Sequence, residues 1–291
     1  MQPFDRILFP YDFSEAADAM APAVAALAKK FDAIVTVLNA FNLVHDLDIG
    51  PRMAEPLEAP PEAVPYLPAI QELRKERERG LEEFAHARFQ HIAHTTLTVD
   101  GDPARAIEWA VKCESPDLVA LPTRGLGRFR RMLLGSVAAK VLHDIDCPVL
   151  TSAHQPHAAL AASGECRSIL CAVRLDAESE ATLRLAAQLA RAYGAHVCLL
   201  HVAAEDERGD REASAAALDR AFREIQGVGA AVDCHVRILA ADWPEGIRQT
   251  AIDEAADLVI VGRGHARASV SRVWSHLYTV IRESPCPVIS V

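Results

Sequence analysis

The residues best suited to bind a ligand form a glycine-containing loop between an apolar run and a predicted helix. The run Leu118–Leu121 is typical of a buried strand, and Gly125 and Gly127 follow it in a polar segment. Gly135 and Ser136 come next, and the apolar spacing after them predicts a helix that begins there. The first N–H groups of a helix have no partner inside it, and the helix dipole adds positive charge at that end. Because glycines let the backbone approach a ligand closely, this stretch predicts a binding site for phosphate groups.

Four arginines lie in this loop, although the protein as a whole is acidic. Its formal net charge is -10, which argues against a general nucleic-acid binder and against a protein that binds anionic membranes. Arg124 directly precedes Gly125, so it is the arginine that we expect to pair with bound phosphates. Arg128, Arg130 and Arg131 are interpreted as part of a solvated face.

The cysteines and histidines do not predict a further site. The seven cysteines are odd in number and none is spaced as Cys-x2-Cys, so buried free thiols in a reducing compartment are expected. His86, His91 and His94 are not spaced as ligands on one helix face, so no metal site is predicted there. No signal peptide is evident, and no apolar run has the length of a membrane span. These features predict a soluble, cytoplasmic protein.

Alternating strand and helix patterns must position the glycine-containing loop. In the first half of the chain the predicted strands cover 6–10, 33–40, 95–99 and 118–121, and a further strand starts near Cys147. Helices are predicted at 15–31, 69–91 and 102–113, and after Gly135. Residues 42–68 are rich in proline and lack periodicity, so they are interpreted as a loop or a loosely ordered insertion.

The same order of elements recurs in the second half, which indicates a tandem duplication. Ile169 follows Ile7 by 162 residues, whereas Cys286 follows Cys147 by 139. The difference is close to the length of the insertion, so one insertion accounts for most of it. The predicted domains, called here the first and second copy, are 1–153 and 167–291, joined by a small-residue linker at 154–166.

This alternation of apolar strands and helices predicts parallel sheets with helices on both faces. Each copy is therefore expected to be a doubly wound α/β domain with a five-stranded parallel sheet. Ligands bind such sheets at the carboxyl ends of the strands, where the strand order reverses. The loops after Phe9, Asn39 and Leu121 all lie at that end.

With these residues in view, the chain resembles the universal stress protein family in its tandem two-domain form. The family's nucleotide motif is Gly-x2-Gly-x9-Gly-Ser/Thr, and Gly125 with Gly135-Ser136 matches its second part, while Pro122 stands at its first glycine. The family's signature after the first strand is Pro-x-Asp, an apolar residue and Ser, which here is Pro10-Tyr11-Asp12-Phe13-Ser14. The resemblance covers nearly the whole length outside the insertion and the linker.

The resemblance implies a Rossmann-like fold and an ATP site in the first copy, with or without magnesium. In ATP-binding relatives the aspartate of the first signature lies beside the adenine and ribose, and the end of the second strand gives backbone hydrogen bonds to the adenine. The Gly-Ser turn and the residue after it hold the phosphates. The implied site in this sequence consists of Pro10, Tyr11, Asp12, Ala40, Leu121, Arg124, Gly125, Gly127, Gly135, Ser136 and Val137.

Two further features limit what the site is expected to do. The sequence has no Gly-Lys-Ser/Thr motif and no evident Walker-B acid, so no catalytic residues and no fast phosphoryl transfer are predicted. The second copy has Arg174 in place of Asp12, and Trp274-Ser275 in place of Gly135-Ser136. A tryptophan at the glycine position would fill the phosphate space. The second copy is therefore expected to bind no ATP and to serve as a packing partner.

The function that we expect is an ATP-binding stress-response protein, which acts as a nucleotide-dependent regulator or chaperone-like factor on an unknown protein partner. The first alternative is a slow ATPase or nucleotide hydrolase, and the second is a nucleotide-free scaffold that uses its dimerisation surfaces. The resemblance also implies that the copies pair through their last strands, 148–151 and 287–291, as an internal pseudo-dimer, and the whole chain could in addition form a homodimer. The insertion at 42–68 is interpreted either as a lid over the nucleotide or as a surface loop.

Overall fold

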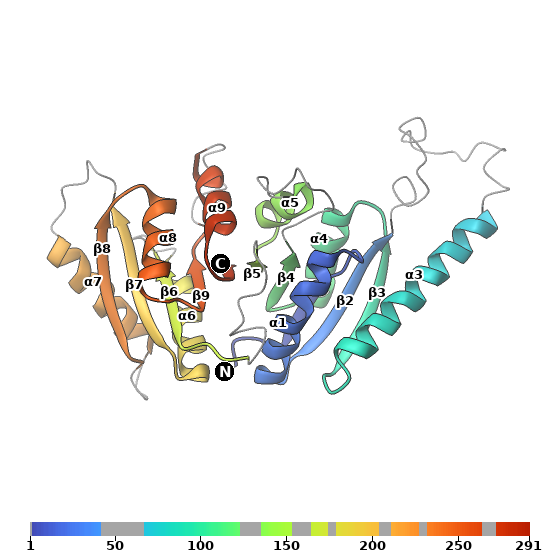
Figure 1. The fold of residues 1–291 in the computed structure, drawn as a ribbon, viewed down its shortest axis with the longest axis horizontal. Helices are drawn as coiled ribbons and strands as arrows, with labels where there is room; N and C mark the ends of the chain where they lie inside the picture. Colours follow the sequence, from blue (N-terminus) through green and yellow to red (C-terminus); the bar gives the residue numbers. More distant parts are fainter. Residues whose placement is uncertain are drawn as a thin grey trace.

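The strands of the described residues join into one continuous sheet. The computed structural model describes residues 2–41, 67–122, 135–152, 164–173, 179–203, 211–226, 232–263 and 272–291. Its sheet is ten-stranded, with the order β3-β2-β1-β4-β5-β10-β9-β6-β7-β8 (Figure 1). The strands are β1 Arg6–Pro10, β2 Ile34–Phe41, β3 His94–Asp100, β4 Leu118–Pro122, β5 Val149–Ser152, β6 Ser168–Ala172, β7 His196–Ala203, β8 Cys234–Ala240, β9 Leu258–Val261 and β10 Val288–Ser290.

The sheet consists of two parallel halves that meet at its centre. Within each half all neighbouring strands are parallel, and β5 and β10 are antiparallel, with Leu150 opposite Ile289. Thr151 adds a side-chain hydrogen bond across this junction, because its hydroxyl donates to the Val288 carbonyl over 3.2 Å. The expected pairing of the two copies through their last strands is confirmed, so the two doubly wound halves share one sheet.

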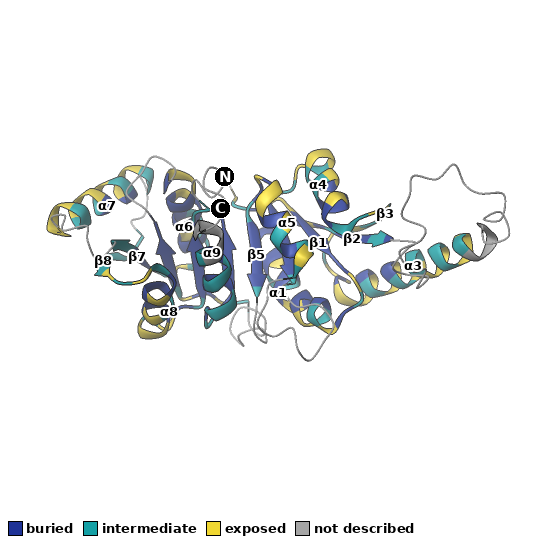
Figure 2. Ribbon diagram, turned by 90° about the horizontal axis from the view of Figure 1, so that it is seen from above, coloured by how far each residue is buried: buried dark blue, intermediate teal, exposed yellow. Residues whose placement is uncertain are grey.

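Helices cover both faces of this sheet. They are α1 Glu15–Phe31, α3 Leu67–Arg88, α4 Pro103–Glu114, α5 Ser136–Asp144, α6 Ser179–Tyr193, α7 Arg211–Gln226, α8 Trp243–Asp253 and α9 Arg272–Glu283. One apolar cluster packs α1, α3, α6 and α7 on one face, and a second packs α4, α5, α8 and α9 on the other. Each cluster contains residues of both copies, and the central strands between them are buried (Figure 2).

Local sequence signals explain where several of these elements begin. Ser14 precedes α1, and its hydroxyl accepts a hydrogen bond from the N–H of Ala17 over 3.2 Å. Asp102 does the same for α4 by accepting from the N–H of Arg105, and a proline occupies the first turn of that helix. The expected elements are present, with ends that differ by at most three residues. Residues 67 and 68, which the prediction assigned to the insertion, are the first two residues of α3, and residues 42–66 lie outside the described residues.

An aspartate before the fourth strand of each copy ties that strand to the first. The Asp117 carboxylate accepts hydrogen bonds from the N–H groups of Asp5 and Arg6, over 2.8 and 2.9 Å. Asp257 accepts in the same way from Arg167 and Ser168 in the second copy. The repeated Asp-Leu-Val sequence therefore has a structural role, since it sets the position of two neighbouring parallel strands.

Candidate functional site

The strand order of the first copy creates the crevice in which the sequence places a ligand. The chain passes from β1 to β2 and β3 on one side, and then returns to β4 and β5 on the other side. The order reverses between β1 and β4, so the segments that leave these two strands diverge. Pro10 ends β1, Ala40 lies one residue before the end of β2, and Leu121 lies one residue before the end of β4. These three expected site residues are therefore at the same end of the sheet.

The turn after β1 leaves a carboxylate accessible at this end. Asp12 is exposed, and one of its oxygens accepts a hydrogen bond from the N–H of Ser14 over 3.1 Å. Between them, Phe13 has a φ of 60°, in the left-handed region that few non-glycine residues adopt. Ser14 caps the helix, so Asp12 is not needed for that purpose. Its second oxygen remains available to a ligand hydroxyl, such as one on a ribose.

The side chain of Tyr11 does not line this crevice. Its ring is 6% exposed and stacks on Phe84 at 3.7 Å, and its hydroxyl donates to the Asp18 carboxylate over 3.0 Å. Burial and the hydrogen bond to Asp18 raise the pKa of the Tyr11 phenol well above its usual value. A ligand at the end of β1 would therefore meet the backbone of Tyr11. The Leu121 side chain is likewise 3% exposed and belongs to the core.

Asn39 is a polar residue at this end that the sequence analysis did not select. It is 3% exposed and its amide nitrogen donates to the Tyr11 carbonyl over 2.7 Å, which joins the ends of β1 and β2. Its side-chain oxygen is buried and has no hydrogen-bond partner among the described residues. A buried acceptor without a donor is costly. In the sequence, Asn39 is marked only by its type, a carboxamide side chain among apolar residues near the end of β2.

The N-terminus of α5 has no side-chain cap, in contrast to those of α1 and α4. Gly135 is its N-cap residue, and no side chain caps it, whereas Ser14 caps α1 and Asp102 caps α4. The Gly135 carbonyl accepts the first helical bond, from the N–H of Ala139 over 2.9 Å. The N–H groups of the residues between them, Ser136 to Ala138, therefore have no partner within the helix.

The open helix start lies at the same end of the sheet as the crevice. Helix α5 connects β4 to the parallel strand β5, so it must begin at their carboxyl ends and finish at their amino ends. Ser136 is exposed and Val137 is partly buried. Together these groups can bind an anion through backbone N–H groups, a hydroxyl and the helix dipole. The expected loop residues Arg124, Gly125 and Gly127 lie outside the described residues.

The corresponding region of the second copy is arranged differently. Helix α9 starts at Arg272, so Trp274 and Ser275 lie within the helix rather than at a turn before it. Arg263, which follows β9, donates hydrogen bonds to the carbonyls of Leu142 and Ile145 over 3.1 and 2.6 Å. It also donates to the Cys147 carbonyl. The cation thus binds the carbonyls at the C-terminal end of α5, where the helix dipole is negative.

The fold and the repeat agree with a family match that covers almost the whole chain. The model of the universal stress protein family matches residues 3–152 and, a second time, residues 165–291. The chain belongs to the universal stress protein family.

Known universal stress proteins resemble this one in sequence and in fold. One from Thermus aquaticus is 32% identical over 147 residues, which are 50% of this chain and 97% of the relative. One from Methanocaldococcus jannaschii is 29% identical over 147 residues, which are 50% of this chain and 81% of the relative. A solved universal stress protein of Archaeoglobus fulgidus has a TM-score of 0.71 and 22% identity, and the match covers 99% of this chain and 96% of that one. This last likeness concerns the fold.

No helix within the described residues combines the length and the apolar character needed to cross a bilayer. The alternation of parallel strands and covering helices in both halves is that of the Rossmann-like family fold, in agreement with the expected fold class.

Proposed function

We propose that the first copy binds ATP and that the protein acts as a nucleotide-dependent regulator or chaperone-like factor, rather than as a turnover enzyme. The observation that carries this proposal is the uncapped N-terminus of α5 at Gly135, next to the reversal of strand order. A triphosphate would supply the hydrogen-bond acceptors that the backbone N–H groups of Ser136, Val137 and Ala138 lack within the helix. Arg124, Gly125 and Gly127 would complete its binding from the preceding loop.

The nucleoside part would lie toward the ends of β1 and β2. The free oxygen of Asp12 suits a ribose hydroxyl, and the backbone at Ala40 suits the adenine edge. The buried oxygen of Asn39 is a polar acceptor in the same region. Magnesium would enter with the triphosphate. No Walker-type lysine is present in the sequence, which supports binding without fast hydrolysis.

The regulatory part of the proposal concerns the segment 122–137. A triphosphate bound at α5 would contact this segment, and a partner protein would recognise its nucleotide-bound form. The expected result is slower amide hydrogen exchange in peptides that cover 122–137 when ATP is saturating. Unchanged exchange in those peptides, in a protein that does bind ATP, would contradict the regulatory mechanism without affecting the proposed site.

The binding site itself is tested by thermal unfolding of the full chain, cleared of bound nucleotide, with and without magnesium-ATP. A ligand at a hundredfold excess over its dissociation constant stabilises the folded state by about 2.7 kcal/mol. Gly135→Trp would fill the phosphate space, and Gly135→Asp would place a carboxylate there. Gly135 has φ -60° and ψ 148°, a conformation open to any residue, so neither change strains the backbone.

We expect a rise in the wild-type midpoint with ATP and no rise in either variant, with similar midpoints for all three proteins without ligand. A rise of equal size in both variants would place the nucleotide elsewhere. No rise in the wild type would exclude the ATP proposal and favour a nucleotide-free scaffold.

A further inference from the structure

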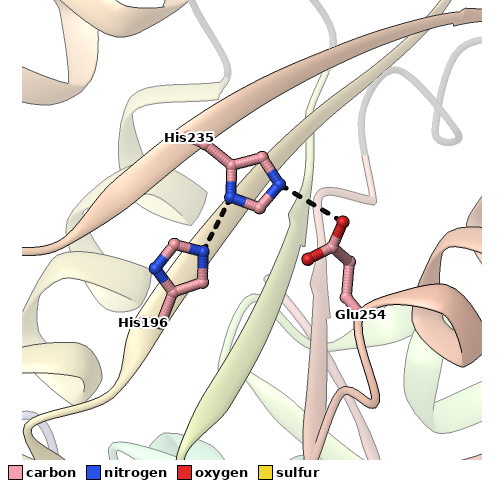
Figure 3. A group of neighbouring side chains, drawn as sticks. All are labelled: His196, His235 and Glu254. Atoms are coloured by element: carbon pink, nitrogen blue, oxygen red, sulfur yellow. Dashed lines mark hydrogen bonds and ion pairs between the residues drawn. The ribbon is translucent and has the colours of Figure 1, made fainter.

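A pair of histidines at the amino ends of β7 and β8 forms a polar cluster in the second copy (Figure 3). His196 is the first residue of β7, and His235 is the second residue of β8. Nε2 of His196 and Nδ1 of His235 lie 2.7 Å apart. The ring planes are 17° apart with centroids at 4.8 Å. Because the two nitrogens are much closer than the ring centres, the rings meet at their edges, where the nitrogen lone pairs lie.

Each histidine is held by a carboxylate on its other ring nitrogen. Nδ1 of His196 lies 3.0 Å from the Asp233 carboxylate, and Nε2 of His235 lies 3.2 Å from the Glu254 carboxylate. An ionised carboxylate can only accept hydrogen bonds, so each of these outer nitrogens carries the proton. In neutral imidazoles the two inner nitrogens are then both acceptors. Two lone pairs would then face each other at 2.7 Å, so either a proton, as in an N–H···N hydrogen bond, or a metal ion must lie between them.

We propose that His196 and His235 bind one divalent transition-metal ion of the zinc type through these inner nitrogens. A ring nitrogen oriented by a carboxylate on its far side is the usual arrangement of a metal-bound histidine. Zinc–nitrogen bonds are about 2.0–2.1 Å long, so tetrahedral binding requires the two nitrogens to move apart by roughly 0.6 Å. The side chains are 32% and 40% exposed, which leaves room for this movement and for water as the remaining ligands.

The charge of the surroundings suits a divalent cation. The carboxylates of Asp233, Glu254 and Asp253 contribute -3. The Arg237 guanidinium contributes +1 and pairs with Glu254 over 2.9 Å, so the net charge with neutral histidines is -2. The Glu254 carboxylate also lies among the potential ligand atoms of the pair, all of which are within 4.8 Å of one another.

The first copy shows that the fold does not require these histidines. Cys198 is opposite His235 in the β7–β8 register, and Thr36 is opposite Thr95 in the β2–β3 register, so Thr95 is the counterpart of His235. Ile34, 42% exposed at the start of β2, is the counterpart of His196. Thr36 and Thr95 form a hydroxyl–hydroxyl hydrogen bond of 3.2 Å there. The histidines therefore add chemistry to a position that the fold satisfies without them.

The proposal is tested by calorimetric titration of Zn²⁺ into the full chain after removal of bound metal. The test variant is His196→Gln with His235→Gln, and its matched control is His86→Gln with His91→Gln, two exposed histidines of the first copy. We expect one saturable site in the wild type and in the control, and at least a tenfold loss of affinity in the test variant. Asp233→Asn and Glu254→Gln should each weaken zinc binding, by about 10- to 100-fold.

Thermal unfolding of the same proteins provides a second readout. Zinc should raise the midpoint of the wild type and the control, and leave that of the test variant unchanged. The zinc-free midpoint of the test variant shows whether it still folds, and Glu254→Gln keeps the proposal testable if it does not. Equal zinc affinity in the test variant and the wild type would overturn the proposal. So would a wild type without saturable binding, which would indicate that a proton occupies the space between the rings.

Discussion

The two copies share a fold and a core but differ at both ends of their strands. At the carboxyl ends, the first copy has the exposed Asp12 carboxylate and the open start of α5, whereas in the second copy Arg263 contacts the first copy. At the amino ends, the first copy has Ile34 and Thr95, whereas the second has a histidine pair. The residues that differ lie outside the shared core. After duplication, the residues at the strand ends can therefore change, and with them the ligands that they bind, while the sheet between them stays the same.

The largest expected effect comes from the junction that both copies share. Leu150 and Ile289 face each other across β5 and β10, and each is 1% exposed. Leu150→Ala should lower the free energy of unfolding by about 2–5 kcal/mol, because a buried side chain is replaced by a cavity. Ile289→Ala is the matched change in the other copy and should cost about the same.

Denaturant unfolding monitored by circular dichroism measures both variants. A single transition is expected for the wild type, since the apolar clusters run through both copies. The double variant should show a coupling energy of about 0.5–3 kcal/mol, as expected for residues in contact. Two well-separated transitions in the wild type would contradict the view of one shared core.

The second prediction concerns the asymmetry at Arg263. Its guanidinium donates to three carbonyls of the first copy. A hydrogen bond to a charged group contributes about 1.5–3 kcal/mol to the free energy of unfolding. Arg263→Gln should destabilise the protein by about 2 kcal/mol or more in chemical unfolding, because at least one of these carbonyls loses its charged donor. Arg184→Gln, which breaks an exposed pair with Glu180, is the control and should have little effect. Equal effects of the two changes would mean that Arg263 does not hold the copies together.

Sequence patterns predicted the features that depend on neighbouring residues. The starts of α1 and α4 are such features, because Ser14 and Asp102 stand directly before apolar helical patterns. The direction of the Tyr11 side chain also had a signal, because Tyr11 lies two residues after Phe9 and points to the same face of the sheet as that core residue.

The histidine pair could not be predicted from the sequence in the same way. His196 and His235 are 39 residues apart, and they meet because β7 and β8 pair in one particular register. A shift of that register by one residue would turn His235 to the opposite face. The repeat itself holds a signal, however, since it aligns the two histidines with Ile34 and Thr95, neither of which is a usual zinc ligand. Comparison of the copies, rather than motif spacing, identifies such sites.

The third prediction compares capped and uncapped helices within the first copy. Ser14→Ala should lower the free energy of unfolding by about 1 kcal/mol, because α1 loses its capping hydroxyl. Gly135→Ser should instead raise it by a few tenths of a kcal/mol, since serine gives α5 a cap that it lacks. Chemical unfolding without nucleotide measures both. A loss of stability in Gly135→Ser would show that the α5 terminus is already satisfied by another group.

The smallest expected effect concerns the thiols. They differ between the copies in solvent exposure, and not in their contribution to stability. Cys113 in the first copy is exposed and Cys234 in the second is partly buried, whereas the other five cysteines are buried. Burial raises the pKa of Cys147 and of its counterpart Cys286 to about 12. At pH 8 these two are therefore protonated and inaccessible, and a disulfide reagent should modify Cys113 rapidly, Cys234 slowly and the rest after unfolding.

Cys113→Ser should remove the fast phase of thiol modification and leave zinc affinity unchanged, since Cys113 belongs to the copy without the histidine pair. This result would separate the proposed site from adventitious binding to an accessible thiol. A loss of the saturable zinc site in Cys113→Ser would instead assign the metal to the first copy. The contrast between the amino ends of the two copies would then have no consequence for metal binding.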